Sequence, residues 1–194
     1  MKKRKIIIGV TGSLAAGKTS VTNEFVSLGA TRVDADAIAH DLLAGNEEIK
    51  RKIQITFGPI VMEFGEVNSK KLALEVFSDR EKLEKLCGII HPLIIERVRR
   101  AVSDAESEIV VVDAPLLFES GLAEEMDMVV VVTADGETSI KRSAAKGISE
   151  VTARKIMASQ MPLEDKIKMA DHVIINEDEI EKIKEGVKKV WLKK

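Results

Sequence analysis

The chain has 194 residues, 45% of them hydrophobic and 32% charged, which is enough for one well-buried core and an inserted subdomain. Its net charge of −2 does not indicate a general nucleic-acid binder, and no apolar stretch approaches the roughly 18 residues of a membrane span. The single Cys87 excludes an intrachain disulfide or a cysteine-based zinc cluster. We therefore expect a cytoplasmic protein that binds neither nucleic acid nor membrane.

The first predicted strand, Lys5–Val10, leads directly into a phosphate-binding loop. The basic residues 2–5 resemble the start of a secretory signal, but the apolar run is too short, and we expect a solvated chain start instead. The loop matches G-x-x-x-x-G-K-[ST] at every fixed position, and it comprises Gly12, Ser13, Leu14, Ala15, Ala16, Gly17, Lys18 and Thr19. A helix expected at Lys18–Leu28 completes the strand, loop and helix that this motif requires.

This loop predicts a nucleoside triphosphate site for physical reasons. Gly12 and Gly17 let backbone N–H groups approach phosphate oxygens, and the helix adds the positive end of its dipole. Lys18 supplies a point charge for the β- and γ-phosphates, and Thr19 offers its hydroxyl to Mg²⁺. Ser20, next along the helix, completes the predicted site. The alternative, a glycine-containing helix start with an exposed lysine, does not account for the complete match.

Two carboxylates follow the second predicted strand, Thr31–Val33. Asp34 and Asp36 stand where open α/β sheets present ligand-facing groups, and in extended geometry residues two apart point the same way. Either carboxylate could accept the proton of an attacking hydroxyl or coordinate Mg²⁺ through water. For each of them an N-cap on the following helix is the alternative.

Residues 35–105 predict a helical insertion, because four helical patterns follow one another without a convincing long strand. These patterns are Ala37–Leu43, Glu47–Phe57, Lys70–Val76 and Arg80–Ala101. Turns are expected at residues 58–59 and 64–65, and Pro92 is expected to kink or restart the last helix. Such an insertion suits a cap that holds a second substrate, with His91 in its cleft. The alternative is a packing excursion in which His91 only packs or caps.

Three more apolar runs predict buried strands, at Glu108–Asp113, Met128–Thr133 and His172–Ile175. Their continuous rather than alternating hydrophobicity suits a parallel sheet covered on both faces. Helical patterns alternate with them at Glu137–Lys146, Glu150–Gln160 and Asp178–Leu192. We therefore expect a three-layer α/β fold with a parallel sheet and right-handed crossovers.

The strand Glu108–Asp113 ends in a carboxylate, like the acidic strand that often backs a phosphate loop and helps to hold Mg²⁺. Four apolar residues followed by Asp are a common pattern, so this signal is weak by itself. The residues Pro115, Leu116 and Glu119 follow, and Pro115 redirects the chain at the strand end. We expect Glu119 either to cap a helix or to hold a substrate-binding loop.

Basic side chains gather in two consecutive helical patterns, at Arg142, Lys146, Arg154 and Lys155. Arg142 and Lys146 are four residues apart and share one helix face, where like charges repel. A polyphosphate under a closing lid would relieve that repulsion, and a solvated basic face is the alternative. Arg142 is the better clamp because its planar fork stays charged and binds phosphate through two hydrogen bonds.

Taken together, these features resemble the dephospho-CoA kinase family nearly end to end. The segments that carry the resemblance are Ile8–Gly12, Gly17–Thr19, Val33–Asp36, Val76–Asp79, His91–Ile94, Pro115–Glu119, Gln160–Lys166, Ala170–Ile174 and Asn176. The phosphate loop is common to many kinases, whereas Asp-Ala-Asp, His-Pro-Leu-Ile and Pro-Leu-Leu-Phe-Glu in this order are much more specific. Two departures are present: Ser13 and Ala15 stand where the family usually has glycine, and Lys155 where arginine is common.

The resemblance implies transfer of the γ-phosphoryl group of ATP to the ribose 3′-hydroxyl of dephospho-CoA, the last step of coenzyme A biosynthesis, with Mg²⁺. It implies a single P-loop kinase domain with a core at about 1–36 and 106–194, a helical acceptor-binding region at about 37–105 and a lid at about 137–168. Asp36 matches the base and Arg142 a lid arginine, which with Lys18 form the expected catalytic set, and Asn176 lies near the nucleotide base. The residues expected toward the acceptor are Asp34, Phe77, His91, Pro115, Leu116 and Glu119.

Three other functions fit parts of the pattern. Another small-molecule or nucleoside monophosphate kinase would share the loop, and acceptor competition would separate it. A GTPase switch has less support, because no Asn-Lys-x-Asp motif is present. A non-catalytic nucleotide-binding regulator would keep the loop, but the intact Lys18, Thr19 and Asp36 argue against it. The sequence leaves the oligomeric state open.

Overall fold

The computed structural model describes residues 4–76, 79–177 and 180–193. Phe77, which the resemblance places toward the acceptor, lies outside these residues, as does Asp178, the expected start of the last helix. The chain divides into two compact units, Met1–Asp34 with Ala101–Lys194 and Ala35–Arg100. The first unit contains the phosphate loop, and the second contains most of the helical insertion.

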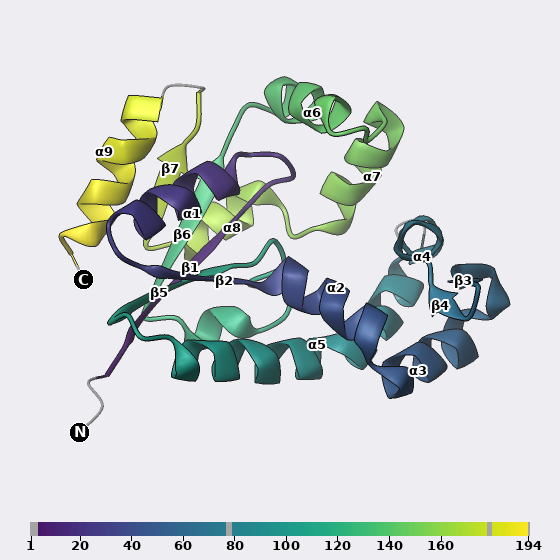
Figure 1. Ribbon diagram of the computed structural model, residues 1–194. Coiled ribbons are helices and arrows are strands. Elements are labelled where there is room, and N and C mark those ends of the chain that lie inside the picture. Colours follow the sequence, from purple (N-terminus) through teal and green to yellow (C-terminus); the bar gives the residue numbers. More distant parts are fainter. Residues whose placement is uncertain (1–3, 77–78, 178–179, 194) are drawn as a thin grey trace. The chain divides into compact units, whose positions relative to one another are not determined.

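A five-stranded parallel sheet forms the centre of the first unit (Figure 1). Its strands are β1 (Ile6–Gly12), β2 (Thr31–Asp34), β5 (Ile109–Asp113), β6 (Met128–Thr133) and β7 (His172–Ile175). They lie in the order β2-β5-β1-β6-β7, and every neighbouring pair is parallel. The five predicted strands are confirmed, with ends that differ by at most two residues.

The helices α1 (Lys18–Ser27) and α9 (Ile180–Trp191) lie side by side over one face of the sheet (Figure 1). Ile8 and Val10 of β1 belong to the core on this face and are fully buried, as is Phe25 of α1. Because side chains alternate along a strand, every second strand residue contributes to this core. The remaining strand residues need a second covered face, since they are apolar too.

That second face is covered by the segment between β5 and β6 and by α8 (Leu163–Met169), which packs on β6. Leu117 is fully buried, and a Cβ atom on Gly9 would lie 2.7 Å from Leu117 and 2.8 Å from Met126. The predicted three-layer α/β fold is therefore confirmed. Its sheet presents the phosphate loop at the carboxyl ends of the strands, where open α/β sheets bind ligands.

Between β6 and β7 the chain forms α6 (Gly136–Ala145), α7 (Glu150–Ser159) and α8. The first two helices are confirmed, and so is the last helix, α9, within its described residues. The sequence patterns do not predict α8, because it is short, begins after Pro162 and consists mostly of charged residues. Its position in the first unit nevertheless matters for the site, since it carries Lys166.

The second unit consists of α2 (Ala35–Gly45), α3 (Glu47–Phe57), η1 (Pro59–Val61), α4 (Ser69–Val76) and most of α5 (Arg80–Asp104). Its predicted helices are confirmed. The strands β3 (Met62–Glu63) and β4 (Glu66–Val67) form an antiparallel hairpin around the predicted turn. Phe64 and Gly65 at that turn both have positive φ, 50° and 85°, as a two-residue hairpin turn requires.

Of the two outcomes predicted at Pro92, a kink or a restart of the helix, the restart does not occur. α5 continues through Pro92 over 25 residues. Loss of one hydrogen bond and the clash of the proline ring cost about 3 kcal/mol. Buried apolar side chains on the same helix, Leu86, Ile94 and Val98, offset that cost.

Lys5 is not part of a purely solvated chain start. Its Nζ donates hydrogen bonds to the carbonyl oxygens of Val102 and Ser103, at 2.5 and 2.8 Å. These carbonyls belong to the last turn of α5, where a cation meets unpaired acceptors and the negative end of the helix dipole. The residue before β1 thus fixes the end of the helix that returns the chain to the first unit.

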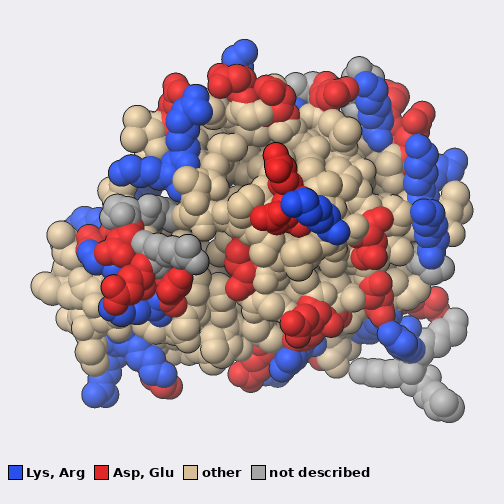
Figure 2. All heavy atoms as spheres, turned by 180° about the vertical axis from the view of Figure 1, so that it is seen from behind, with Lys and Arg blue, Asp and Glu red and all other residues tan. Residues whose placement is uncertain are grey.

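Charged side chains of both signs occur on the surface. On the face shown in Figure 2, the described Lys and Arg side chains are interspersed with Asp and Glu side chains. Among the described helices, none has the length and hydropathy of a membrane span.

Candidate active site at the phosphate loop

The phosphate loop connects β1 with α1 through residues that take unusual backbone angles. Gly12 has φ of 154°, Gly17 of 92° and Ala15 of 53°. A Cβ atom on Gly17 would lie 1.9 Å from Nδ2 of Asn176, and one on Gly12 would lie 2.1 Å from the carbonyl oxygen of Val132. Glycine is therefore required at both positions. Ala15 takes a left-handed conformation, which explains why glycine is usual there in the family that the sequence resembles.

The start of α1 is left open to an external acceptor. The N-terminal ends of α3, α6 and α7 are capped by the side chains of Asn46, Asp135 and Ser149. Gly17, at the same position of α1, makes no side-chain cap. Ser13 Oγ is buried and has no hydrogen-bond partner among the described residues. A helix end without a side-chain cap, next to a buried hydroxyl without a partner, fits a phosphate group.

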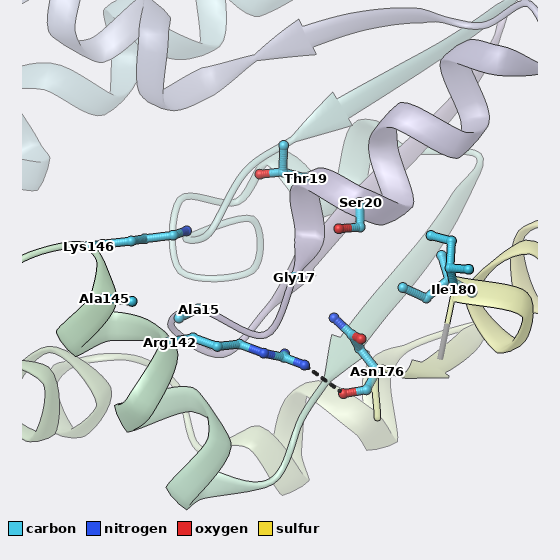
Figure 3. A pocket seen from close by; sticks show the side chains of 10 residues that line it. Ala15, Gly17, Thr19, Ser20, Arg142, Ala145, Lys146, Asn176 and Ile180 are labelled. Carbon is cyan, nitrogen blue, oxygen red and sulfur yellow. Dashed lines mark hydrogen bonds between the residues drawn. The ribbon is translucent and has the colours of Figure 1, made fainter. Parts of the chain in front are cut away.

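A cavity of about 420 Å³ lies against this loop (Figure 3). It is lined by Ala15, Gly17, Thr19, Ser20, Arg142, Ala145, Lys146, Asn176, Ile180 and Ile183. The loop and basic side chains supply polar walls, and the two isoleucines of α9 supply an apolar wall. This combination suits a nucleotide, which has charged phosphates and a flat base of low charge.

Two side chains from other elements hold the loop backbone. Asn176, directly after β7, donates from Nδ2 to the carbonyl oxygen of Ala16 at 2.8 Å. Arg142 of α6 reaches across to donate to the carbonyl oxygens of Asn176 at 3.4 Å and Ala16 at 3.5 Å (Figure 3). The structure thus brings Arg142, Asn176 and the loop together. Both distances from Arg142 are long for hydrogen bonds.

The carboxylates after β2 and β5 are also brought together. Asp34 and Asp113 face each other as partners on these adjacent strands. Arg32 of β2 donates from Nη2 to Oδ2 of each carboxylate, at 2.7 Å in both cases. Arg32 is a residue that the sequence analysis did not identify. A charged residue inside a predicted buried strand was the available signal, because a buried arginine needs partners.

Asp113 titrates unusually because of its place in the sheet. Burial raises the pKa of its carboxyl group, and the nearby charge of Asp34 acts in the same direction. The positive charges of Lys18 and Arg32 lower this pKa. The charge of Lys18, the motif lysine, therefore stabilises the ionised form of the Asp113 carboxyl group.

Asp34 and Asp36 do not share an extended segment, so the expectation that they point the same way is wrong. β2 ends at Asp34 and α2 begins at Ala35. Asp36 consequently lies in the first turn of a helix, where its negative charge is favourable to the dipole. Asp36 and the half-buried His91 of α5 belong to the second unit.

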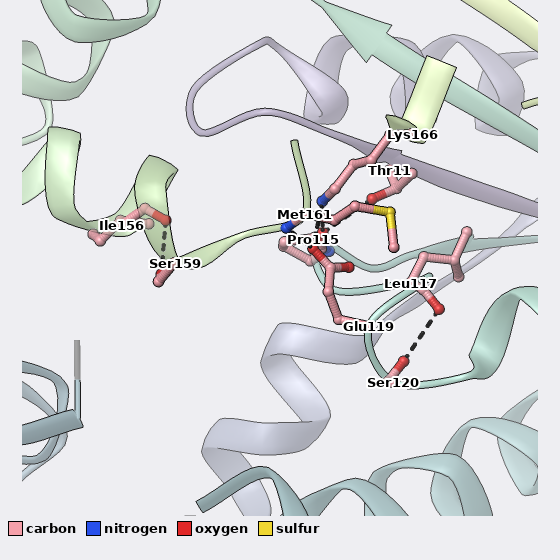
Figure 4. Close-up of polar contacts among 9 residues, drawn as sticks. All are labelled: Thr11, Pro115, Leu117, Glu119, Ser120, Ile156, Ser159, Met161 and Lys166. Atoms are coloured by element: carbon pink, nitrogen blue, oxygen red, sulfur yellow. Dashed lines mark hydrogen bonds and ion pairs between the residues drawn. The ribbon is translucent and has the colours of Figure 1, made fainter. Parts of the chain in front are cut away.

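Glu119 takes part in a group of contacts that we call the clasp: Thr11, Pro115, Glu119, Met161 and Lys166. Lys166, 1% exposed, pairs with Oε1 of Glu119 at 2.9 Å and donates to the carbonyl oxygen of Pro115 at 3.0 Å (Figure 4). The same Pro115 oxygen accepts from Thr11 Oγ1 at 3.0 Å, and Oε1 of Glu119 accepts from the Met161 N–H at 2.8 Å. The clasp joins β1, the segment after β5 and the start of α8.

Glu119 thus holds its loop rather than capping a helix. Pro115 and Leu116 of this loop are half-buried. Oε2 of Glu119 is buried and has no partner among the described residues, which leaves one atom for the acceptor contact that we predict. Lys166 is a second residue whose role the sequence did not indicate, since its partners lie 47 to 51 positions earlier in the chain.

The parallel sheet, the G-x-x-x-x-G-K-T turn after its first strand and the helix start without a side-chain cap define a P-loop nucleotide-binding protein. Shikimate kinase from Acinetobacter baumannii shares the fold, with a TM-score of 0.54 at 14% identity over 96% of this chain and 91% of that one.

Closer matches narrow this class. The family model for dephospho-CoA kinase matches residues 6–182. The dephospho-CoA kinase of Carboxydothermus hydrogenoformans is 38% identical over 186 residues, which cover 93% of this chain and 90% of that protein. A Thermus thermophilus crystal structure matches with a TM-score of 0.83 and 31% identity over 98% of both chains. The chain belongs to the dephospho-CoA kinase family, and its activity is the ATP-dependent phosphorylation of dephospho-CoA in coenzyme A biosynthesis.

Proposed function

We propose that the chain transfers the γ-phosphoryl group of ATP to the ribose 3′-hydroxyl of dephospho-CoA, giving coenzyme A and ADP. The observation that carries this proposal is the start of α1 without a side-chain cap, beside a cavity of about 420 Å³ with basic and apolar walls. Family membership supports the choice of acceptor. We further propose that residues of about 137–168 act as a lid and that residues of about 37–105 bind the acceptor.

The residues present fit ATP and Mg²⁺. Backbone N–H groups of the loop and the Lys18 ammonium would hold the phosphates, and the buried Ser13 Oγ has capacity for one more hydrogen bond. Thr19 is exposed, lines the cavity and would supply a hydroxyl to Mg²⁺. Asp113, on whose carboxyl group the charge of Lys18 acts, would supply a carboxylate. When bound, Mg²⁺ neutralises charge on the phosphate oxygens. No group of three or more acidic, His or Cys ligands occurs among the described residues, in keeping with a metal held mainly by phosphates and water.

The catalytic work of the protein is then positioning and charge stabilisation. Lys18 and Arg142 would stabilise the transferred phosphoryl group, and Asn176 would fix the loop beneath it through the Ala16 carbonyl. Asp36 would orient the 3′-hydroxyl and accept its proton late in the transfer. Closure of the lid would exclude water, so hydrolysis of ATP without acceptor should be slow.

A direct assay tests the proposal. The purified chain is incubated with ATP, Mg²⁺ and dephospho-CoA, and the acceptor is analysed by mass and by ³¹P NMR. We expect one added phosphoryl group, at the 3′-position. When dephospho-CoA, nucleoside monophosphates and shikimate are offered together, we expect the chain to phosphorylate dephospho-CoA in preference to the others. Phosphorylation of another offered acceptor in preference to dephospho-CoA would overturn the proposal.

The variant Asp36→Asn tests the proposed base. We expect kcat to fall by about 10²- to 10³-fold, because a positioned base contributes on that order, while the affinity for ATP changes less than twofold. Steady-state kinetics and calorimetry with a non-hydrolysable ATP analogue separate the two quantities. An unchanged kcat would remove Asp36 from this role.

A further inference from the structure

Arg32 joins two carboxylates at the carboxyl end of the sheet. A single atom, Nη2, donates to Oδ2 of Asp34 and Oδ2 of Asp113, at 2.7 Å each. The Arg32 side chain is 27% exposed, and its Nε is buried without a partner among the described residues. The guanidinium is thus held by charge-assisted hydrogen bonds from Nη2 to the two carboxylates, and its Nε contributes none to the described residues.

The two carboxylates need such a cation because of the strand register. Asp34 and Asp113 are directly paired residues of adjacent parallel strands, and the Asp113 side chain is only 6% exposed. Two like charges this close, one of them buried, repel each other strongly in a medium of low dielectric. Arg32 lies two residues before Asp34 on the same strand, so its side chain points to the same face of the sheet.

Lys18 shares one of these carboxylates with Arg32. Both cations act on the charge of Asp113, although Lys18 stands at the start of α1 and Arg32 within β2. The four side chains Lys18, Arg32, Asp34 and Asp113 sum to zero formal charge. Without the guanidinium, the same set would carry one net negative charge.

We propose that Arg32 is a positioning residue for nucleotide binding, which neutralises Asp34 and Asp113 so that the positive charge of Lys18 acts on the phosphates rather than on two uncompensated carboxylates. The inference rests on the proposed function, since it takes Lys18 as a phosphate ligand. The proposal predicts that loss of the Arg32 charge changes nucleotide affinity and divalent-cation affinity in opposite directions. Removal of its charge disfavours the anionic nucleotide and favours a divalent cation in the same place.

The test measures ADP affinity by calorimetry in EDTA and in saturating Mg²⁺, for the wild-type chain and for Arg32→Met. We expect the affinity in EDTA to fall fivefold or more, since Coulomb's law gives about fivefold for each unit of ligand charge roughly 9 Å away at an effective dielectric constant of about 40, and ADP carries about three. In Mg²⁺ we expect a smaller fall, because the metal cancels about two of these charges and responds to the guanidinium in the opposite direction. The strengthening of ADP binding by Mg²⁺ is therefore larger in the variant.

Two further variants isolate the charge. Arg32→Lys keeps the charge without the planar fork, and we expect it to recover most of the affinity in EDTA. Arg4→Met is the matched control, because Arg4 also pairs with an aspartate, Asp127, at 2.6 Å, but precedes β1 at the other end of the sheet. It should bind ADP like the wild type. Should Arg32→Met fail to fold, which circular dichroism detects, Arg32→Gln takes its place.

The outcomes separate the inference from the proposed function. A wild-type chain that binds no ADP and phosphorylates no dephospho-CoA overturns the proposed function. An active wild type whose Arg32→Met variant loses equal affinity with and without Mg²⁺, or loses none in EDTA, overturns the inference alone. An Arg32→Lys variant as weak as Arg32→Met also overturns it, since the charge would then not be the cause.

Discussion

The phosphate loop and the clasp lie in the same unit but use their polar groups in opposite ways. At the loop, the start of α1 has no side-chain cap, and Ser13 Oγ is buried without a partner among the described residues. In the clasp, the Lys166 ammonium is 1% exposed and has two acceptors, Glu119 and the Pro115 carbonyl. The loop leaves hydrogen-bonding groups to a ligand, whereas the clasp, apart from Glu119 Oε2, uses its polar groups within the protein.

This difference teaches how to interpret the polar residues of the motif segments. Groups that the protein satisfies contribute to its stability, whereas groups reserved for a ligand lower it until the ligand binds. A variant in the clasp should therefore change stability first, and a variant at the loop should change binding first. The following changes test that distinction, from the largest expected effect to the smallest.

Lys166→Met should destabilise the chain by about 3 kcal/mol or more, because loss of one partner leaves the other charge of a buried pair uncompensated. The Pro115 carbonyl also loses one of its two donors. Urea unfolding followed by circular dichroism measures the change. Wild-type stability in this variant would contradict the role that we give to the clasp.

The same helix offers a matched control for that experiment. Lys168 of α8 pairs with Asp165 at 2.9 Å, but its side chain is 71% exposed. Lys168→Met should cost less than about 1 kcal/mol, since exposed ion pairs contribute little. In the double variant Glu119→Gln/Lys166→Met no uncompensated charge remains, and we expect it to regain part of the lost stability.

Gly17→Ala should weaken ATP binding more than tenfold while costing about 1–3 kcal/mol of stability. A Cβ atom at this position meets Asn176 Nδ2 at 1.9 Å, so either the Asn176 amide moves and loses its hydrogen bond to Ala16 or the loop shifts. Backbone N–H groups aimed at phosphate lose their alignment as a result. Calorimetry with a non-hydrolysable ATP analogue measures the affinity.

Gly29→Ala separates steric contact from backbone strain in that result. Gly29 also has a positive φ, 102°, but a Cβ atom there meets nothing within 4 Å. We expect Gly29→Ala to lose about as much stability as Gly17→Ala, because of backbone strain, and to bind ATP as tightly as the wild type. Equal loss of affinity in both variants would show that general destabilisation, rather than the Asn176 contact, weakens binding.

Much of the nucleotide side could be predicted from the sequence because its signals are local. The loop residues 12–19 are contiguous, and most strands of the sheet are short apolar runs. The helix start without a side-chain cap could also be predicted, because Gly17, which has no side chain, directly precedes Lys18 at the start of α1. Asn176 came only from the family resemblance, and the structure now gives it a physical task in holding the Ala16 carbonyl.

The pairs that complete the site could not be predicted, because they join distant parts of the chain. Arg32 and Asp113 are 81 residues apart and meet through strand order. Lys166 meets Glu119 only once α8 has packed on the sheet. The error over Asp36 has a local cause, since nothing at Asp34-Ala35 indicates that a strand changes into a helix without a connecting loop.

Asp113→Asn should slightly stabilise the chain at neutral pH, and it is the smallest effect that we expect. Burial raises the pKa of the Asp113 carboxyl group, so the folded state binds this proton more tightly than the unfolded state. Its contribution to stability is therefore favourable at low pH and is lost as the pH rises through the folded-state pKa. Asparagine removes that loss, and we expect a Tm higher by roughly 1–3 °C at pH 7. The difference should shrink as the pH is lowered toward 4. A Tm below that of the wild type at pH 7 would place Asp113 with the stabilising charges of the clasp rather than with the ligand-facing groups of the loop.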